Sequence, residues 1–238
     1  MSTMKDHADV TAETPTANAS CAIDFPPLAD TSMLRDPPPT PRGVRTRAAL
    51  IAAARRVFQR NGYLDAQITD ITKAARFSTG TFYTYFSNKD EILQAVLEQV
   101  QDDMLHPGIA RLDDDSETSP YTLIEAGNRA YLQAYQRNAQ LMMLLEQVAI
   151  ADPHFREIRR RRAQAFVQRN AHAIADLQKR GLADPRLDAY QASRALSAMV
   201  SRLAYFTFCL RDDDTPIEGL VETCTRLWAN ALKLSTPT

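Results

Sequence analysis

Apolar side chains recur at intervals of three and four residues along most of the chain, which is the spacing of an amphipathic helix. In residues 42–62 these positions are Leu50, Ile51, Ala54, Val57 and Phe58. Asn61 and Gly62 then supply a helix stop. No segment alternates apolar and polar residues over the length of a strand, so the pattern predicts an all-α protein without a sheet.

Three further helices are expected close behind the first. A short helix covers about 68–75, with Ile71 and Ala74 facing inward, and the next covers about 79–86. Phe82 and Phe86 lie on one face of the latter, which predicts that they are core residues. A longer helix begins near Asn88. Two short helices separated by about three residues are typical of a helix-turn-helix.

The rest of the chain returns to a helical period after a break. His106, Pro107, Gly108 and an acidic stretch at 113–117 interrupt the pattern. Further helices are predicted at about 120–136, 139–151, 153–180, 187–211 and 216–234. The first 41 residues lack hydrophobic periodicity and are rich in Thr, Ala, Pro and Asp, so we expect a disordered tail at 1–41.

Charge is distributed unevenly along the 238 residues, although the formal net charge is only −1. Residues 42–100 hold nine Lys and Arg against five Asp and Glu. Residues 1–41 hold two basic and six acidic residues. A positive block inside a nearly neutral chain favours a polyanionic partner for residues 42–100.

The remaining composition argues against several other classes of function. Cys21, Cys209 and Cys224 show no CxxC spacing and the four histidines do not cluster in sequence, so we expect neither disulfides nor a metal site. The chain has no Gly-rich phosphate loop and no serine elbow, and therefore no catalytic residue and no cofactor are expected. No apolar run has the length of a membrane span and no secretory signal is visible, which predicts a cytoplasmic protein without a membrane partner.

The second short helix carries side chains suited to DNA. Its polar positions are Ser78, Thr79, Thr81, Tyr83, Thr84 and Tyr85. Hydroxyl and phenol groups suit phosphate oxygens and base edges, and the helix N-terminus adds N–H donors. A helix of this size fits the major groove of DNA.

One family combines these features in the same order. The matching steps are Phe58 to Gly62, Asp70-Ile71-Thr72, Ala75-Arg76-Phe77-Ser78, Gly80-Thr81-Phe82-Tyr83-Thr84-Tyr85-Phe86 and Asn88-Lys89. Over residues 45–97 the sequence thereby resembles the N-terminal domain of TetR-type transcription regulators. The resemblance implies a three-helix DNA-binding domain at 42–100 and a helical ligand-binding and dimerisation domain at 101–238.

The resemblance also assigns roles to individual positions. Thr79 and Gly80 would meet base edges, Thr81, Tyr83 and Tyr85 would mostly touch phosphate, Ser78 would cap the recognition helix, and Lys89 would anchor a phosphate. Two positions depart from the family pattern. Arg76 stands where the family has a left-handed glycine, at a cost of roughly 1 kcal/mol. Gln67 stands where the family often has Thr, so the cap passes to Thr69 or is lost.

The C-terminal part supports weaker expectations. Its last two helices resemble those that pair across a two-fold axis in the family, which implies a homodimer that reads a palindromic operator. The apolar positions expected there include Ala195, Leu196, Met199, Leu203, Phe206, Leu220, Leu227 and Ala231. Candidate residues for an apolar small-molecule effector are Tyr131, Tyr135, Met142, Met143, Phe166, His172, Met199, Tyr205 and Phe208. Ordinary core packing is the alternative for all of them.

Four consecutive arginines at 159–162 raise the alternative of an acidic ligand. Four successive residues cover all sides of a helix, so at most one or two are expected to line a pocket, and a solvated face is favoured. Taken together, the resemblance predicts a DNA-binding transcription regulator, specifically a repressor released from its operator by an effector. An activator of the same family and a helical adaptor without DNA binding are the alternatives.

Overall fold

The computed structural model describes residues 38–105, 119–211 and 214–234, and within these ranges every regular element is a helix. The helices are α1 (Pro41–Asp65), α2 (Ile68–Ala75), α3 (Thr79–Tyr85), α4 (Lys89–Leu105), α5 (Pro120–Arg137), α6 (Ala139–Ala151), α7 (Pro153–Lys179), α8 (Ala189–Ala204), the π-helix η2 (Tyr205–Leu210) and α9 (Ile217–Leu232). The predicted all-α class is confirmed. Most of the predicted tail, Cys21 and the break at 106–117 lie outside the described residues.

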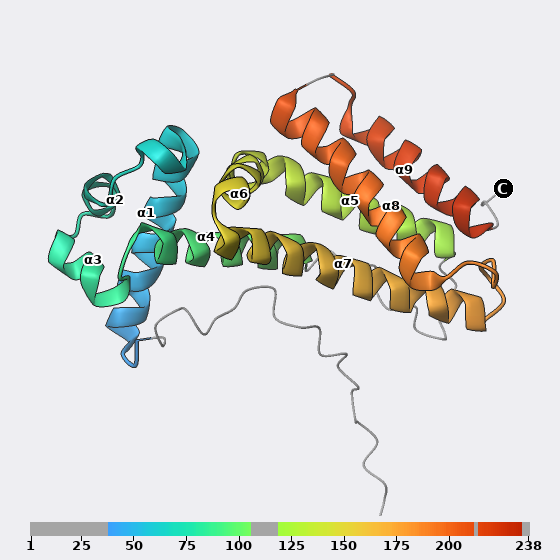
Figure 1. Ribbon diagram of the computed structural model, residues 1–238, viewed down its shortest axis with the longest axis horizontal. Coiled ribbons are helices and arrows are strands. Elements are labelled where there is room, and N and C mark those ends of the chain that lie inside the picture. Colours follow the sequence, from blue (N-terminus) through green and yellow to red (C-terminus); the bar gives the residue numbers. More distant parts are fainter. Residues whose placement is uncertain (1–37, 106–118, 212–213, 235–238) are drawn as a thin grey trace, which may run out of the picture.

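Two groups of helices lie at opposite ends of the molecule (Figure 1). Helices α1 to α3 form one group, and α5 to α9 form the other, with the long α7 running beneath α5 and α8 in this view. Helix α4 packs against α1 on one side and against α5 and α6 on the other. The domain boundary expected after residue 100 therefore falls inside a helix that belongs to both groups.

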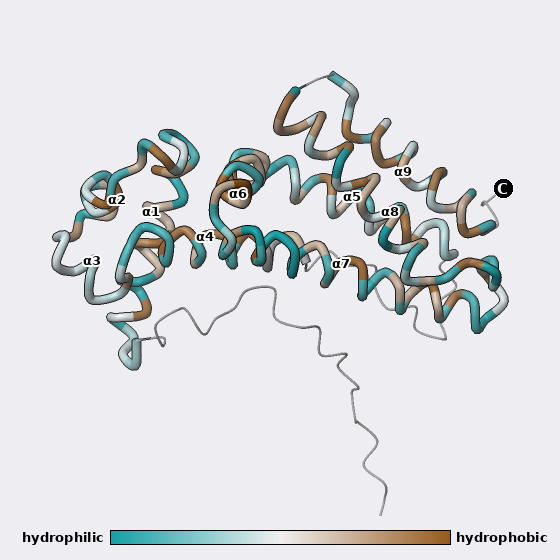
Figure 2. Tube along the Cα trace, viewed as in Figure 1, coloured by the Kyte–Doolittle hydropathy of each residue, from teal (hydrophilic) through white to brown (hydrophobic). Residues whose placement is uncertain are grey.

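One continuous apolar core joins the two groups. It includes Phe58, Phe82 and Phe86 at one end and Leu132 and Leu141 at the other, all with at most 1% of their surface exposed. Figure 2 shows the corresponding hydrophobic stretches on the sides where helices face one another. Burial of apolar surface on this scale is the main stabilising contribution to such a helical fold.

The inward face of α2 differs from the prediction. Ala74 is exposed, whereas Thr72 is 3% exposed and donates a hydrogen bond from Oγ1 to the Thr69 carbonyl oxygen at 3.1 Å. Ile71 is fully buried, as expected. The expectation for Ala74 is wrong because the buried stripe of this eight-residue helix passes through 68, 71, 72 and 75, and residue 74 lies beside it.

The first helix bends near its end. Gly62 has φ 73° and ψ −179°, outside the helical region, and the chain resumes a helical course to Asp65. The predicted stop at Asn61 and Gly62 is therefore a kink followed by one further turn. Glycine tolerates this backbone conformation, which residues with a Cβ rarely adopt.

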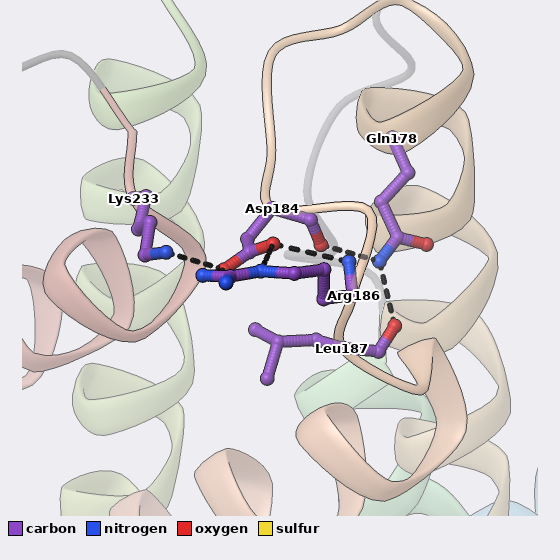
Figure 3. Close-up of polar contacts among 5 residues, drawn as sticks. All are labelled: Gln178, Asp184, Arg186, Leu187 and Lys233. Carbon is purple, nitrogen blue, oxygen red and sulfur yellow. Dashed lines mark hydrogen bonds and ion pairs between the residues drawn. The ribbon is translucent and has the colours of Figure 1, made fainter.

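The loop between α7 and α8 is fastened to the end of α9 by Asp184 (Figure 3). Its carboxylate pairs with Arg186 at 3.2 Å and with Lys233 at 2.7 Å, and its backbone N–H donates to the Leu232 carbonyl oxygen at 2.9 Å. Gln178 Nε2 donates to the carbonyl oxygens of Asp184 and Leu187 at 2.9 and 2.8 Å. These bonds fix the loop before α8 relative to the C-terminal end of α9.

Candidate functional site

Helix α3 is anchored by its cap and by two buried rings. Ser78 Oγ accepts the backbone N–H of Thr81 at 3.1 Å, which confirms the predicted cap. Phe82 and Phe86 are fully buried, with ring centroids 5.7 Å apart, and their core role is confirmed. The helix is thus held by its inner face and its N-terminus, and its outer face remains available.

The outer face of α3 presents hydroxyl and aromatic groups to solvent. Thr79, Gly80 and Thr84 are exposed, and Tyr83 is 49% exposed with its ring edge-on to Phe82 at 5.5 Å. Thr81 and Tyr85 are half-buried at the margins of this face. The structure therefore brings the predicted contact residues of α3 onto a single short helix whose N-terminal turn is open.

The turn between α2 and α3 adopts the backbone that the sequence pattern requires. Arg76 has φ 60° and ψ 40°, the left-handed conformation, and its N–H donates to the Lys73 carbonyl oxygen at 3.2 Å. The Phe77 N–H donates to the Thr72 carbonyl oxygen at 3.0 Å, which closes the helix end. The Arg76 side chain is exposed beside the start of α3.

The N-terminus of α2 has a capping box between Gln67 and Asp70 that the sequence reasoning missed. The carboxylate of Asp70 accepts the Gln67 backbone N–H at 3.3 Å. Thr69 is exposed and donates only a long hydrogen bond, 3.4 Å, to the Gln67 side chain. Both expectations, transfer of the cap to Thr69 and its loss, are therefore wrong, because Gln67 stays the N-cap and forms a capping box with Asp70 at the third helical position. A phosphate contact by Thr69 stays a prediction.

Lys89 lies at the joint between α1 and α4. Its ammonium group donates to the carbonyl oxygens of Tyr63 at 2.7 Å and Ala66 at 3.1 Å, with that of Leu64 at 3.4 Å. It also lies 4.3 Å from the centroid of the Tyr63 ring, and burial lowers the pKa of the amine. The Tyr63 hydroxyl in turn donates to Asp90. The Lys89 ammonium thus binds the carbonyl oxygens at the end of α1, a role that no local pattern around Lys89 predicts.

A cavity of about 740 Å³ lies within the C-terminal group, between α5, α7, α8 and the Trp228 side chain of α9. Four predicted effector residues line it, namely Tyr131, Tyr135, Phe166 and Tyr205. The Tyr131 ring meets Phe166 edge-on at 5.3 Å, and burial raises the pKa of the Tyr135 phenol. The result is a partly aromatic wall of the size that small-molecule sites have.

The other predicted effector residues do not line this cavity. Met142 is 2% exposed and belongs to the core of α6. His172 is exposed, and its Nδ1 lies 2.8 Å from the Gln168 carbonyl oxygen of its own helix. Met199 and Phe208 pack on the core beside the cavity, and Met143 is half-buried away from it. Helical periodicity predicted the helices on which these residues lie, but it did not predict which face of each helix lines the cavity.

The arginine run contributes more to the cavity than expected. Arg159, Arg160 and Arg162 all line it, so the expectation of one or two is wrong. Side chains about half a helical turn apart on α7 line the same cavity, because the long arginine stems extend to it from both flanks of the helix. Sequence reasoning also missed Trp228, whose indole N–H is buried without an acceptor among the described residues.

Polar bonds connect the helix-turn-helix group to the cavity group. Arg55 Nη2 of α1 donates to Asn138 Oδ1, between α5 and α6, at 2.7 Å. His154 Nε2 at the start of α7 lies 2.9 Å from Gln94 Oε1 of α4. Arg162 in the cavity wall donates to the Met104 sulfur of α4 at 3.2 Å. The cavity wall therefore contacts α4 directly through Arg162.

In the ranges 38–105, 119–211 and 214–234, no three His, Cys, Asp or Glu side chains group as a metal site would need. None of the helices described there is long and apolar enough to cross a membrane.

Comparison with known proteins matches both groups of helices. Residues 50–96 match the family described as bacterial regulatory proteins, tetR family, and residues 124–233 match the C-terminal domain of the transcriptional regulator EthR. The regulator TtgR of Pseudomonas putida is 29% identical over 199 residues, covering 80% of this chain and 92% of TtgR. EthR of Mycolicibacterium smegmatis is 23% identical over 208 residues, covering 81% of this chain and 92% of EthR.

Solved structures share the fold. GusR of Salmonella enterica superposes with a TM-score of 0.66 at 19% identity, covering 80% of this chain and 96% of GusR. A transcriptional regulator from Rhodococcus sp. superposes with a TM-score of 0.65 at 21% identity, covering 80% of this chain and 99% of that one. With its helix-turn-helix and its EthR-like C-terminal domain, this chain belongs to the TetR family of bacterial regulatory proteins, which are DNA-binding transcription regulators and not enzymes.

Proposed function

We propose that the chain is a repressor that binds a palindromic operator as a homodimer and is released from it by a small molecule held in the C-terminal cavity. The observation that carries this proposal is the pairing of an exposed recognition helix with a cavity of about 740 Å³ in one molecule. In this assignment Thr79 and Gly80 meet base edges, and Thr81, Tyr83 and Tyr85 meet phosphates.

The exposed basic side chains of the same group support binding to a polyanion. They are Arg42, Arg45, Arg56, Arg60, Lys73 and Arg76. Such charges contribute affinity that is independent of base sequence and falls with salt. Thr69 and Ser78 stay in the proposed contact set, at the N-terminal ends of the two short helices. Lys89 is proposed to act indirectly, by fixing α1 to α4, since its ammonium is engaged by carbonyl oxygens.

Helices α8 and α9 are the proposed dimer interface. Leu196 and Leu220 are buried within the protomer, so these two cannot meet a partner. Leu227 is 43% exposed and Leu210 is 46% exposed, and Ala195 and Ala231 are exposed as well. Association of two such faces across a two-fold axis would place two recognition helices in successive major grooves about 34 Å apart.

Release would follow as a shift between two arrangements of the dimer. An effector that favours an arrangement with badly spaced recognition helices lowers operator affinity, and the operator lowers effector affinity by the same factor. The Arg55–Asn138 and Gln94–His154 bonds are the proposed connections between α1, α4 and the cavity helices. A transcriptional activator would use the same parts, and no feature of the described residues favours it.

The direct test begins with selection of binding sites from random DNA, followed by mobility shift on the selected sequence and on the region upstream of the gene. The proposal predicts a palindromic site bound by a dimer with strong salt dependence. Selection of no sequence, or binding of a monomer to a non-palindromic site, would refute it.

A further inference from the structure

The charged residues of the cavity wall are almost all of one sign. Six arginines line the cavity, and Glu146 is the only acidic residue among the described residues that do so. They are Arg159, Arg160, Arg162, Arg169, Arg194 and Arg202. Four of them are exposed, whereas Arg162 and Arg169 are half-buried, and a half-buried charge costs desolvation free energy.

Acidic neighbours neutralise Arg159 and Arg160. Arg159 pairs with Glu146 at 2.8 Å, and Arg160 pairs with Glu157 through two bonds of 2.7 Å. In the described part of the chain, Arg162, Arg194 and Arg202 have no carboxylate within ion-pair distance. Arg202 instead lies over the rings of Tyr205 and Phe206 at 5.1 and 4.4 Å.

Arg162 is the best placed of these to bind a ligand. Its Nε is buried with no acceptor among the described residues, and its Nη2 has only the weak sulfur acceptor of Met104 at 3.2 Å. Its guanidinium carbon lies 5.9 Å from the centroid of the Phe166 ring. A buried guanidinium donor without an oxygen acceptor is costly, and a carboxylate is the group whose geometry satisfies it best.

The rest of the wall suits an extended apolar body. Between Arg159 and Asn170, the lining residues of α7 cover about 16 Å of helix. Beyond Arg162 this wall includes Phe166 and Val167, with Tyr131 and Ile124 opposite on α5. Arg169 stacks on the same Phe166 ring at 5.0 Å, and burial lowers its pKa. The cavity is therefore elongated, partly aromatic and positively charged along one side.

We infer that the effector is an elongated amphiphile with one anionic head group, held at Arg162, and an apolar body that lies along Phe166 and Tyr131, with Arg202 as a further positive charge of the same wall. This inference rests on the proposed function, since it names the ligand class of the proposed effector cavity. It also replaces the apolar small-molecule effector that the aromatic residues alone suggested. Because Arg162 also contacts Met104, the head group would bind beside the C-terminal end of α4, the helix that packs against α1 as well as α5 and α6.

The chain provides its own reporter of binding. Trp228 is its single tryptophan, and it lines the cavity. Titrations of the full-length protein with dodecanoate, dodecanol and dodecyltrimethylammonium, each below its micellar concentration, compare one chain length with three head-group charges. The expected result is a Trp228 fluorescence change with dodecanoate at a Kd about tenfold or more below that of dodecanol, and no saturable change with the cation.

Arginine variants test which side chain binds the anionic head group. Arg162→Met should weaken dodecanoate binding about tenfold and leave dodecanol binding unchanged, because it removes the guanidinium and keeps an apolar stem. Arg202→Met, at an exposed position, provides the same comparison if the first variant folds poorly. Arg161→Met is the matched control, since Arg161 pairs with Glu157 and does not line the cavity.

The outcomes separate this inference from the proposed function. Equal or tighter binding of dodecanol, no binding of dodecanoate, or equal losses for both ligands in Arg162→Met would overturn the anionic head group. Operator release by dodecanol without preference for dodecanoate would keep the proposed function and reject this inference. Tight, Arg162-dependent dodecanoate binding that leaves operator affinity unchanged would support the inference and refute release by the effector.

Discussion

The Lys89 ammonium lies 2.7 Å from the carbonyl oxygen of Tyr63, across 26 residues of sequence, and so joins the end of α1 to the start of α4. Lys89→Met should lower the free energy of unfolding by about 1–3 kcal/mol, because part-buried carbonyl oxygens lose a charged donor. Urea unfolding followed by circular dichroism measures this loss. Lys73→Met, at an exposed position of α2, is the control and should change stability little.

The same variant distinguishes this structural role from a phosphate contact. A lysine that binds phosphate contributes about one unit to the slope of log K against log salt. We predict that the slope for operator binding is the same for Lys89→Met and the wild type. A slope reduced by about one unit, with stability unchanged, would restore the phosphate-anchoring role that the family resemblance implies.

Asp184 makes stability depend on pH in the acid range. Hydrogen bonds from Arg186 and Lys233, and from the Arg186 backbone, hold the pKa of its carboxyl well below its ordinary value. A lowered pKa in the folded state means that the stabilisation is complete above the unfolded pKa of about 3.9 and is lost as pH falls from there toward the folded value.

Asp184→Asn should therefore lower the urea midpoint at pH 7 and flatten its decline below about pH 4. The comparison variant is Asp176→Asn, whose carboxylate forms only an exposed pair with Lys179 and should leave both features nearly unchanged. An Asp184→Asn protein with the wild-type midpoint at pH 7 would show that the ion pairs of the Asp184 carboxylate contribute nothing measurable.

Arg76 stores backbone strain at the turn of the helix-turn-helix. Arg76→Gly should stabilise the protein by up to about 1 kcal/mol, because glycine adopts φ 60° without a steric penalty. The measurement is again urea unfolding. Arg180→Gly is the control, since Arg180 has φ −83° at the end of α7, and there the same change should destabilise by about 0.5–1 kcal/mol. Destabilisation by Arg76→Gly would show that its side chain contributes more than the strain costs.

The exposed leucine of α9 tests the proposed dimer. Leu227→Glu should shift the protein toward monomer in sedimentation velocity and weaken operator binding, because it places a charge in an apolar interface without disturbing the protomer core. Ile150→Glu is matched in chemistry and lies 79% exposed on α6, away from α8 and α9. A Leu227→Glu protein that remains as dimeric as Ile150→Glu would rule out this face as the interface.

The fold was largely predictable because helical period, caps and stops are local signals. The pattern placed Phe82 and Phe86 in the core and Ser78 at the cap, and the structure confirms each. Local signals failed where two choices were nearly equivalent in sequence, as for Ala74 and for the cap that Asp70 provides. In both cases the result depends on side-chain direction within one turn of helix.

The cavity was less predictable, because its wall depends on how distant helices cross. Tyr131 and Phe166 were identified by residue type, whereas His172 had a suitable type but faces solvent. Trp228 joins the wall only because α9 packs against α5, a contact between segments about a hundred residues apart. Helical periodicity predicts which face of a helix is apolar. Which other helix packs against that face depends on the tertiary structure.

DNA recognition through the outer face of α3 is tested most directly by a titration of one fluorescent operator. Anisotropy with the selected operator should show affinity lowered about tenfold or more for Tyr83→Ala and for Thr79→Ala, with unfolding midpoints unchanged, because both side chains are exposed. Gln147→Ala, exposed on α6, should bind like the wild type. Full operator affinity in both α3 variants would contradict DNA recognition through this helix.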